Sequence, residues 1–372
     1  MNIKCGIVGL PNVGKSTLFN ALTHSTIAAE NFPFCTIEPN IGMVHVPDPR
    51  LQRIAALVHP QKVVPTVISF VDIAGLVRGA AEGEGLGNQF LGNIRETDAI
   101  VHVVRCFDSD DIVHVHNKVD PVADIEIINM ELILADLASV EKALQRLQRA
   151  AKNGSKITTA TCDVLMQYQR HLQQGKTIRS LQTDMDSSSD VAKEVKQLHL
   201  LTAKPVLYVA NVAEDQLAED PLARHAYVDQ VAHLAQQEQA QYVVICNKIE
   251  QELLELEPAD KMELLKGYGF TTTGLDRVVQ AGYALLDLHT FFTAGVQEVR
   301  AWSVKAHSTA VEAAGSIHTD FMRGFIRAEV ISYKDFIHYG GEAKVKEAGR
   351  WRLEGKDYVV ADGDIMHFRF NV

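Results

Sequence analysis

The chain has 372 residues, a formal net charge of -11, 47% hydrophobic residues and 22% charged residues. The length predicts two or three domains, the composition argues against a disordered chain, and the acidic charge argues against nucleic-acid binding by the whole surface. The five cysteines lack metal-ligand spacing, the N-terminal apolar run is too short for a signal peptide, and no run reaches the ~20 apolar residues of a membrane span. We therefore expect a cytoplasmic, multidomain monomer without membrane contact.

The first predicted elements are a strand at residues 3–8, a glycine loop and a helix that begins in KSTLFNALT. The segment from Gly9 to Ser16 matches GxxxxGK[ST] in this strand, loop and helix context, which predicts a phosphate-binding loop. Lys15 would contact the β- and γ-phosphates and Ser16 would ligate Mg²⁺. The backbone N–H groups expected around the phosphates belong to Asn12, Val13, Gly14, Lys15, Ser16 and Thr17.

Two further segments are expected to complete the phosphate and metal site. Asp72 follows a predicted strand at 67–71 and is placed to hold Mg²⁺, with the Gly75 N–H available to the γ-phosphate. The hydroxyl of Thr36 could join the Mg²⁺ shell when the γ-phosphate is present. Leu76 stands where many GTPases have a water-orienting glutamine, so intrinsic hydrolysis is expected to be slow. Asn12 raises the additional hypothesis of a K⁺ ion near the phosphates.

Further apolar strands at 100–105, 206–210 and 242–246 alternate with helical stretches and predict a parallel α/β sheet. This alternation is interrupted by a segment in which apolar residues recur at alternating steps of three and four residues, which predicts a helix with a narrow apolar seam. Further helices are expected at about 158–174 and after Ser189. A compact bundle and an antiparallel coiled-coil arm are the alternatives, and the narrow seam favours the arm. The seam comprises Met130, Ile133, Leu137, Val140, Leu144, Leu147 and Ala151.

The motif that follows the strand at 206–210 bears on the choice of base. GTPases read guanine through an NKxD motif, whose Asp accepts two hydrogen bonds from the base, whereas this chain has NVAE at 211–214. Glu214 is one methylene longer than that Asp, so discrimination for guanine should largely be lost. The Val212 backbone and Asn211 could instead serve adenine as donor and acceptor. A second, NKxD-like segment begins at Asn247, but it lies one strand later, and we interpret Lys248 as a solvated lysine.

The last part of the chain has a different character. EVRAW and FIRAEV read as strands around a helix near 311–319, and the segment 357–370 reads as a turn-linked pair of strands. This pattern predicts a small, separate mixed domain.

The segments GLPNVGKST, ENFPFCTIEPN and DIAGLVRGAAEGEGLGNQFL resemble the YchF-type Obg-like ATPases, a branch of the translation-factor NTPases. The C-terminal IHTDFMRGFIRAEV and GKDYVVADGDIMHFRFNV resemble the TGS domain, a β-grasp module. The resemblance implies an α/β fold with a nucleotide-binding domain at 1–265, a helical arm inserted at 128–202, and a TGS domain at 287–370. It also implies a preference for ATP and binding to ribosomal particles.

The resemblance favours His114 as the catalytic residue that places water, although His116 is nearly as plausible from the residues alone. Seven basic residues and one acidic residue lie between Arg146 and Arg179, and we expect them at the far end of the arm, in contact with rRNA. The TGS domain is a second expected contact. The function expected is that of a slow, Mg²⁺-dependent ATPase and ribosome-binding switch. The alternatives are a GTPase of the same family and a nucleotide-regulated binding module with negligible hydrolysis.

Overall fold

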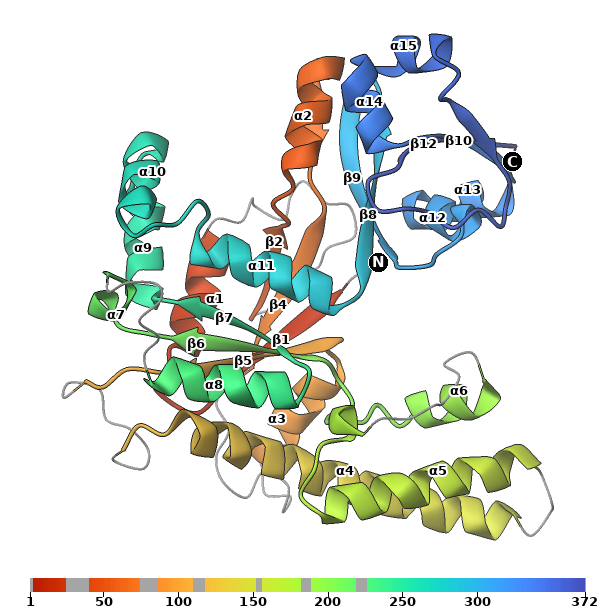
Figure 1. Cartoon of the computed structure of the whole chain (residues 1–372). Coiled ribbons are helices and arrows are strands. Elements are labelled where there is room, and N and C mark those ends of the chain that lie inside the picture. Colours follow the sequence, from red (N-terminus) through yellow and green to blue (C-terminus); the bar gives the residue numbers. More distant parts are fainter. Residues whose placement is uncertain are drawn as a thin grey trace. The chain divides into compact units, whose positions relative to one another are not determined.

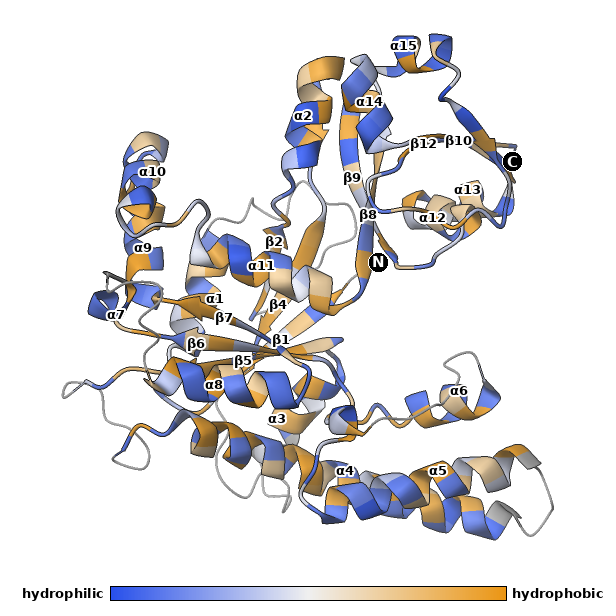
Figure 2. Cartoon of the chain, in the orientation of Figure 1, coloured by the Kyte–Doolittle hydropathy of each residue, from blue (hydrophilic) through white to orange (hydrophobic). Residues whose placement is uncertain are grey.

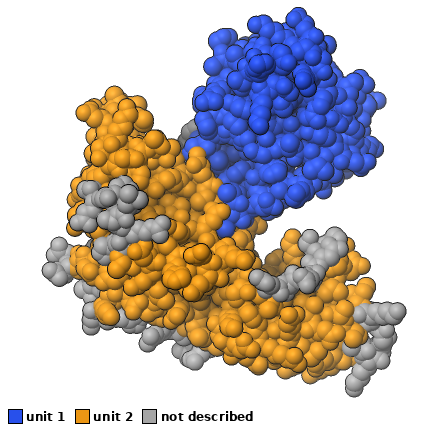
Figure 3. Space-filling view, viewed as in Figure 1, with its two compact units in different colours: residues 1–3, 43–68, 283–372 blue, residues 4–42, 69–282 orange. Residues whose placement is uncertain are grey.

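The computed structural model describes residues 3–24, 40–73, 86–109, 118–151, 156–181, 189–218 and 226–371. The chain divides into two compact units, one formed by 4–42 and 69–282 and the other by 1–3, 43–68 and 283–372 (Figure 3). The domain boundaries expected from the sequence therefore need one change, because residues 43–68 belong with the C-terminal residues. The reason is a long-range pairing: β3 (Lys62–Val64) runs parallel to β9 (Glu298–Lys305).

A six-stranded sheet with the order β2-β4-β1-β5-β6-β7 frames the larger unit (Figure 1). β1 pairs in parallel with β4 and β5, β5 with β6, and β6 with β7. β5 and β6 are buried along their whole length, which explains why they are mainly apolar, apart from the buried His102, Arg105 and Asn211 (Figure 2). The five strands predicted for this sheet are present, and β2 was not predicted. The bounds are β1 (Lys4–Val8), β2 (Ile41–His45), β4 (Val67–Asp72), β5 (Ala99–Arg105), β6 (Val206–Asn211) and β7 (Gln241–Ile245).

Helices connect these strands and cover both faces of the sheet, with α8 on one side and α11 on the other (Figure 1). Local capping fixes where some of them begin. The buried Glu250 carboxylate, for example, accepts hydrogen bonds from the Gly274 and Leu275 N–H groups at 2.7 and 3.2 Å, at the start of α11. The bounds are α1 (Lys15–His24), α3 (Leu86–Arg95), α7 (Glu214–Ala218), α8 (Ala226–Gln237), α9 (Asn247–Glu255), α10 (Pro258–Gly267) and α11 (Gly274–Leu285).

The predicted helical insertion is present as α4 (Pro121–Ala151), α5 (Lys156–Gln173), η3 (Ile178–Ser180) and α6 (Asp190–Lys196). α4 and α5 lie side by side and form an arm (Figure 1). The seam needs one correction: Met130 is 47% exposed, so packing between the helices begins at Ile133. Within the described ranges, no helix is long and apolar enough to cross a membrane. The seam residues Ile133, Leu137, Val140, Leu144 and Leu147 pack with Cys162, Leu165, Tyr168 and Leu172 of α5 and with Val195 of α6.

Buried polar contacts tie the base of the arm to the sheet. Asp136 of α4 accepts hydrogen bonds from the backbone N–H groups of Leu201 and Thr202 at 2.8 and 2.7 Å, and from the Thr202 hydroxyl at 2.7 Å. The Arg179 guanidinium of η3 donates to Glu238 at 3.2 Å, and Glu238 also accepts from the hydroxyl of Tyr208 in β6. Arg179 therefore lies at the base of the arm, and Arg170 and Lys176 lie in the last turn of α5 and just beyond it. This corrects the predicted place of all three residues near the far end.

The smaller unit contains a mixed sheet with the order β11-β10-β12-β8-β9-β3. β8 and β9 form an antiparallel hairpin, α12 follows, and β12 returns parallel to β8 between β8 and β10, which is the topology of a β-grasp fold. Helices cover both faces: Phe291 and Phe292 are neighbours on β8 but belong to different hydrophobic clusters. The remaining bounds are α2 (Pro49–Val58), β8 (Leu288–Ala294), α12 (Ala310–Ile317), α13 (Thr319–Arg323), β10 (Phe325–Ile331), α14 (Tyr333–Tyr339), α15 (Glu342–Glu347), β11 (Arg352–Glu354) and β12 (Ile365–Phe370).

The C-terminal prediction is confirmed for β9, β10 and α12, but not for the final pair of strands. Within 357–370, all of which the structure describes, β12 is the one strand that forms, and Val359 makes a single bridge to Thr309. β8 was missed.

Candidate nucleotide site

The phosphate-binding loop connects the end of β1 to Lys15, the first residue of α1. Its backbone is left-handed at Asn12, with φ 63°, and at Gly14, with φ 99°. A Cβ on Gly9 would lie 2.5 Å from the Val103 carbonyl oxygen, and one on Gly14 would lie 2.4 Å from Nδ2 of Asn247. Glycine is therefore required at both positions, and the loop has the compact shape needed to direct its N–H groups at an anion.

Lys15 is buried, and its ammonium group donates to the Leu10 carbonyl oxygen at 2.6 Å. Burial lowers the pKa of Lys15 to about 8, an effect that the nearby Asp72 carboxylate partly opposes. A desolvated ammonium held inside a phosphate-binding loop is poised to gain a strong interaction when an anion arrives.

The residues predicted to hold Mg²⁺ meet at the end of the loop. The Ser16 hydroxyl donates to Oδ2 of Asp72 at 3.2 Å, which places one residue of α1 against the last residue of β4. Oδ1 of Asp72 is buried and has no hydrogen-bond partner in the part of the chain that the structure describes. A hydroxyl beside a carboxylate with an unsatisfied oxygen fits a hard cation that takes oxygen ligands. Thr36 and Gly75, the other predicted contributors, lie outside the described residues.

Two asparagines fasten the phosphate-binding loop to the neighbouring strands. Nδ2 of Asn211, at the end of β6, donates to the Val13 carbonyl oxygen at 3.0 Å, and Nδ2 of Asn247 donates to the Gly14 carbonyl oxygen at the same distance. The Asn247 N–H in turn donates to Oδ1 of Asn211 at 3.2 Å. The role of Asn247 was not predicted from the sequence. Its position directly after a strand, as at Asn211, was the available signal.

A pocket of about 1000 Å³ opens beside the loop at the carboxyl ends of β6 and β7. This is where parallel α/β sheets bind nucleotides. The predicted base contacts need correction, because the Val212 N–H already donates to the Ile245 carbonyl oxygen and the Asn211 amide is engaged with the loop. The lining residues are Asn12, Gly14, Thr17, Phe107, Asp108, Ser109, Asn211, Val212, Ala213, Glu214, Asp215, Cys246, Asn247, Lys248, Gln251 and Tyr268.

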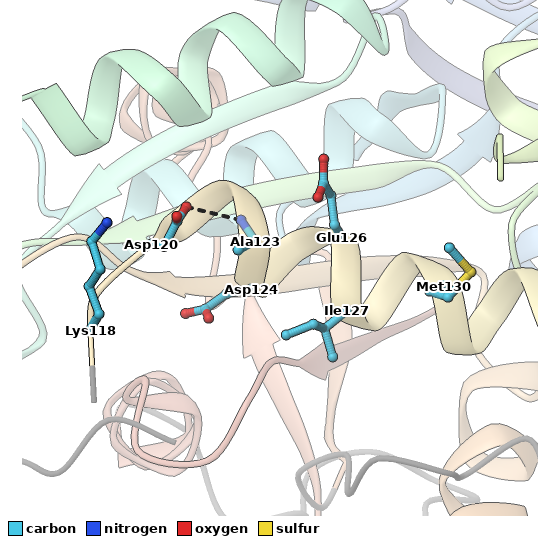
Figure 4. A pocket seen from close by; sticks show the side chains of 7 residues that line it. All are labelled: Lys118, Asp120, Ala123, Asp124, Glu126, Ile127 and Met130. Carbon is cyan, nitrogen blue, oxygen red and sulfur yellow. Dashed lines mark hydrogen bonds between the residues drawn. The ribbon is translucent and has the colours of Figure 1, made fainter. Parts of the chain in front are cut away.

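A second hollow, of about 530 Å³, lies along the first two turns of α4 (Figure 4). Acidic side chains from Asp120, Asp124 and Glu126 line it together with Lys118. It follows residues 110–117, which contain His114 and His116 and lie outside the described residues. The structure therefore does not place either predicted catalytic histidine.

Comparison with known proteins identifies the family. A model described as "50S ribosome-binding GTPase" matches residues 4–135, and the YchF-GTPase C-terminal model, described as "Protein of unknown function (DUF933)", matches residues 288–371. The ribosome-binding ATPase YchF of Haemophilus ducreyi is 58% identical over the full length of both chains. The chain belongs to the YchF family. YchF of Bacillus subtilis is 53% identical, also over both full lengths.

A solved structure, the Schizosaccharomyces pombe YchF GTPase, is 34% identical, covers 99% of this chain and 98% of its own, and superposes with a TM-score of 0.87. The resemblance to YchF-type proteins inferred from the motifs is thus confirmed, and the YchF fold accounts for both units.

Proposed function

We propose that this chain is a Mg²⁺-dependent ATPase that binds ribosomal particles according to its nucleotide state. The observation that carries the proposal is a complete phosphate-binding loop, with Ser16 against Asp72, beside a base pocket that has Glu214 in place of the guanine-reading Asp. The names of the relatives, ribosome-binding ATPases, support the same activity and partner.

In this site Lys15 would neutralise charge on the β- and γ-phosphates, and the loop N–H groups would orient the phosphate chain. Ser16 and Asp72, with Thr36, would hold the Mg²⁺, which would supply positive charge to offset the negative charge that develops during phosphoryl transfer. The asparagine pair keeps the loop in its binding shape before the nucleotide arrives, which avoids an ordering cost on binding. Turnover is expected to be slow because the Leu76 side chain cannot form a hydrogen bond with the attacking water. His114 remains the residue proposed to position that water.

Base recognition needs a different assignment from the one expected, because the Val212 N–H and the Asn211 amide are both engaged. Among the pocket residues, the Ala213 N–H donates to Oε1 of Gln216 at 2.8 Å, a side-chain contact that a base can replace. We propose that the Ala213 N–H donates to adenine N1 and that the Val212 carbonyl accepts from the adenine amine.

The activity is tested by single-turnover hydrolysis of Mg·ATP and Mg·GTP, with and without ribosomes. We expect slow turnover of ATP that ribosomes alter, and loss of turnover in Ser16→Ala, which lacks the metal-binding hydroxyl. Comparing K⁺ with Na⁺ buffers in the same assay tests the proposed K⁺ ion near Asn12. GTP hydrolysis that equals or exceeds ATP hydrolysis would replace the proposal with a GTPase, and absence of both would leave a nucleotide-regulated binding module.

The rRNA contact is proposed at the far end of the arm. Arg146 and Arg149 are exposed in the last turns of α4, at the end of that helix that faces α5 in the sequence. Exposed cations at the end of an arm can reach phosphates without moving the nucleotide site. Hydrogen bonds of Asp136 and Arg179 connect the base of the arm to residues beside the sheet, and through them a change in the sheet would reach a partner bound to the arm.

A further inference from the structure

Three elements bring a carboxylate and two donors together at one wall of the base pocket. Glu214 is the first residue of α7, Lys248 lies in the first turn of α9, and Tyr268 follows the last residue of α10. All three side chains line the pocket. The Lys248 ammonium donates to Oε2 of Glu214 at 2.7 Å, and the Tyr268 hydroxyl donates to Oε1 at 3.3 Å. Each oxygen of the carboxylate therefore has its own donor.

The position of Glu214 gives these contacts a chemical meaning. Glu214 is the last residue of NVAE, so it stands where a GTPase has the Asp that accepts hydrogen bonds from guanine N1–H and the 2-amino group. A free carboxylate at this wall would attract those two donors. It would also repel adenine, whose N1 carries a lone pair instead of a proton. A carboxylate that is paired with an ammonium and a hydroxyl does neither.

We infer that Lys248 and Tyr268 are specificity-determining residues, which keep the Glu214 carboxylate occupied and so disfavour guanine relative to adenine. The inference rests on the proposed ATPase function and names what sets its choice of base. Selection here works by removing an interaction that the wrong base needs, rather than by adding one for the right base. The residue interpreted from the sequence as a solvated lysine thus has a partner and a role.

The electrostatics agree with the geometry. The hydrogen bond and charge of Lys248 lower the pKa of Glu214, and Glu214 raises the pKa of Lys248. Both groups are therefore charged when nucleotide binds at neutral pH. The Glu214 side chain is 41% exposed and the Lys248 side chain is 69% exposed. Ion pairs this accessible contribute little to folding stability. The pair can be removed without unfolding the protein, which permits a clean test.

The test measures the dissociation constants of Mg·ATP and Mg·GTP by competition with a fluorescent nucleotide analogue. Lys248→Met, which has no donor, frees one oxygen of Glu214, and Lys248→Met with Tyr268→Phe frees both. We expect the preference for ATP over GTP to fall about threefold in the single variant, because an exposed ion pair is weak, and further in the double variant. GTP affinity should rise and ATP affinity should fall.

Two controls make the outcome specific. Lys266→Met removes an exposed charge from α10 outside the pocket and should leave the ratio unchanged. Adding Lys248→Met to Glu214→Gln should also leave the ratio of that parent unchanged, because no carboxylate remains to be freed.

Two results would overturn the inference while the proposed ATPase stands: an ATP:GTP ratio within about twofold of the parent in the double variant, or an equal shift with and without the Glu214 carboxylate. If the unmodified protein itself binds GTP as tightly as ATP, the proposed function fails, and the inference fails with it.

Discussion

Lys15 is the residue on which triphosphate binding depends most. Its ammonium is buried against the Leu10 carbonyl oxygen, and the Asp72 carboxylate offsets part of its loss of hydration. Replacing Lys15 with Ala removes the central positive charge from the loop, so we expect binding of Mg·ATP to fall at least about a hundredfold. Calorimetric titration checks this. Affinity close to that of the parent would show that the loop does not hold the phosphates.

The lowered pKa of Lys15 predicts a pH dependence of nucleotide affinity. Phosphate binds the protonated lysine, so affinity should be constant below the pKa of the free protein, about 8. Above it, affinity should fall by up to about tenfold per pH unit, because the proton must be taken up on binding. Titrations with Mg·ATP between about pH 7 and 9.5 check the slope, with adenosine as the control ligand because it lacks phosphates. An affinity for Mg·ATP that stays flat over this range would contradict the buried position of the ammonium.

Asn247 tests whether the two asparagines preorganise the loop. Replacing Asn247 with Ala removes the hydrogen bond to the Gly14 carbonyl oxygen, and we expect Mg·ATP to bind roughly fivefold more weakly. Asn211→Ala should do at least as much, since Asn211 contacts both Val13 and Asn247. Gln236→Ala, on the exposed face of α8, is the matched control for an amide removed away from the site. Equal affinities in all three variants would mean that the loop keeps its shape without these contacts.

At the scale of elements, the arm depends on a buried carboxylate at its base. Asp136→Ala would leave the N–H groups of Leu201 and Thr202 and the Thr202 hydroxyl without their acceptor. We expect the free energy of unfolding to fall by about 3 kcal/mol, measured by urea denaturation. Asp163→Ala on the exposed side of α5 is the control and should change it by less than about 0.5 kcal/mol. A decrease in Asp136→Ala no larger than in the control would show that other contacts hold the base.

The far end of the arm carries the prediction about RNA. Changing Arg149, Lys152 and Lys156 to Glu should weaken ribosome binding strongly and leave ATP affinity nearly intact. Arg149 lies in the last turn of α4 and Lys156 is the first residue of α5, and Lys152 falls between the two helices in the sequence. The slope of the logarithm of the binding constant against the logarithm of the salt concentration should become less negative by about 0.7–0.9 for each phosphate that the variant no longer neutralises. Cosedimentation over a series of salt concentrations measures both effects.

A matched variant changes Arg170 and Lys176, exposed basic residues at the other end of α5 and just beyond it, to Glu. It should retain most ribosome binding. If the far-end variant cosediments as well as the parent at every salt concentration, the C-terminal β-grasp unit becomes the candidate for the contact.

For the whole molecule, the sequence predicted the features that depend on residues close together in the chain. The phosphate-binding loop, Asp72 and the strands of the parallel sheet can each be recognised within a dozen residues. The assignment of 43–68 to the C-terminal unit was not visible, because β3 pairs with a strand more than two hundred residues away. The contacts of Asn247 and Lys248 were missed for the same reason: each depends on a partner from another loop, Gly14 and Glu214. Lys248 is nevertheless 69% exposed, as a solvated lysine should be. Met130 continues the helical period of the seam and is nevertheless exposed, because its neighbour across the arm is Gly175, beyond the end of α5.

We propose that nucleotide bound in this site controls association with ribosomal particles. Cosedimentation of the full chain with ribosomes, at saturating ADP and at a saturating nonhydrolysable ATP analogue, measures this control. We predict that the affinity for ribosomes differs between the two nucleotides by at least about fivefold, which corresponds to the ~1 kcal/mol at the lower end of typical coupling free energies. The difference should vanish in Lys15→Ala. Equal binding in both nucleotide states, with both nucleotides shown to be bound, would contradict the account.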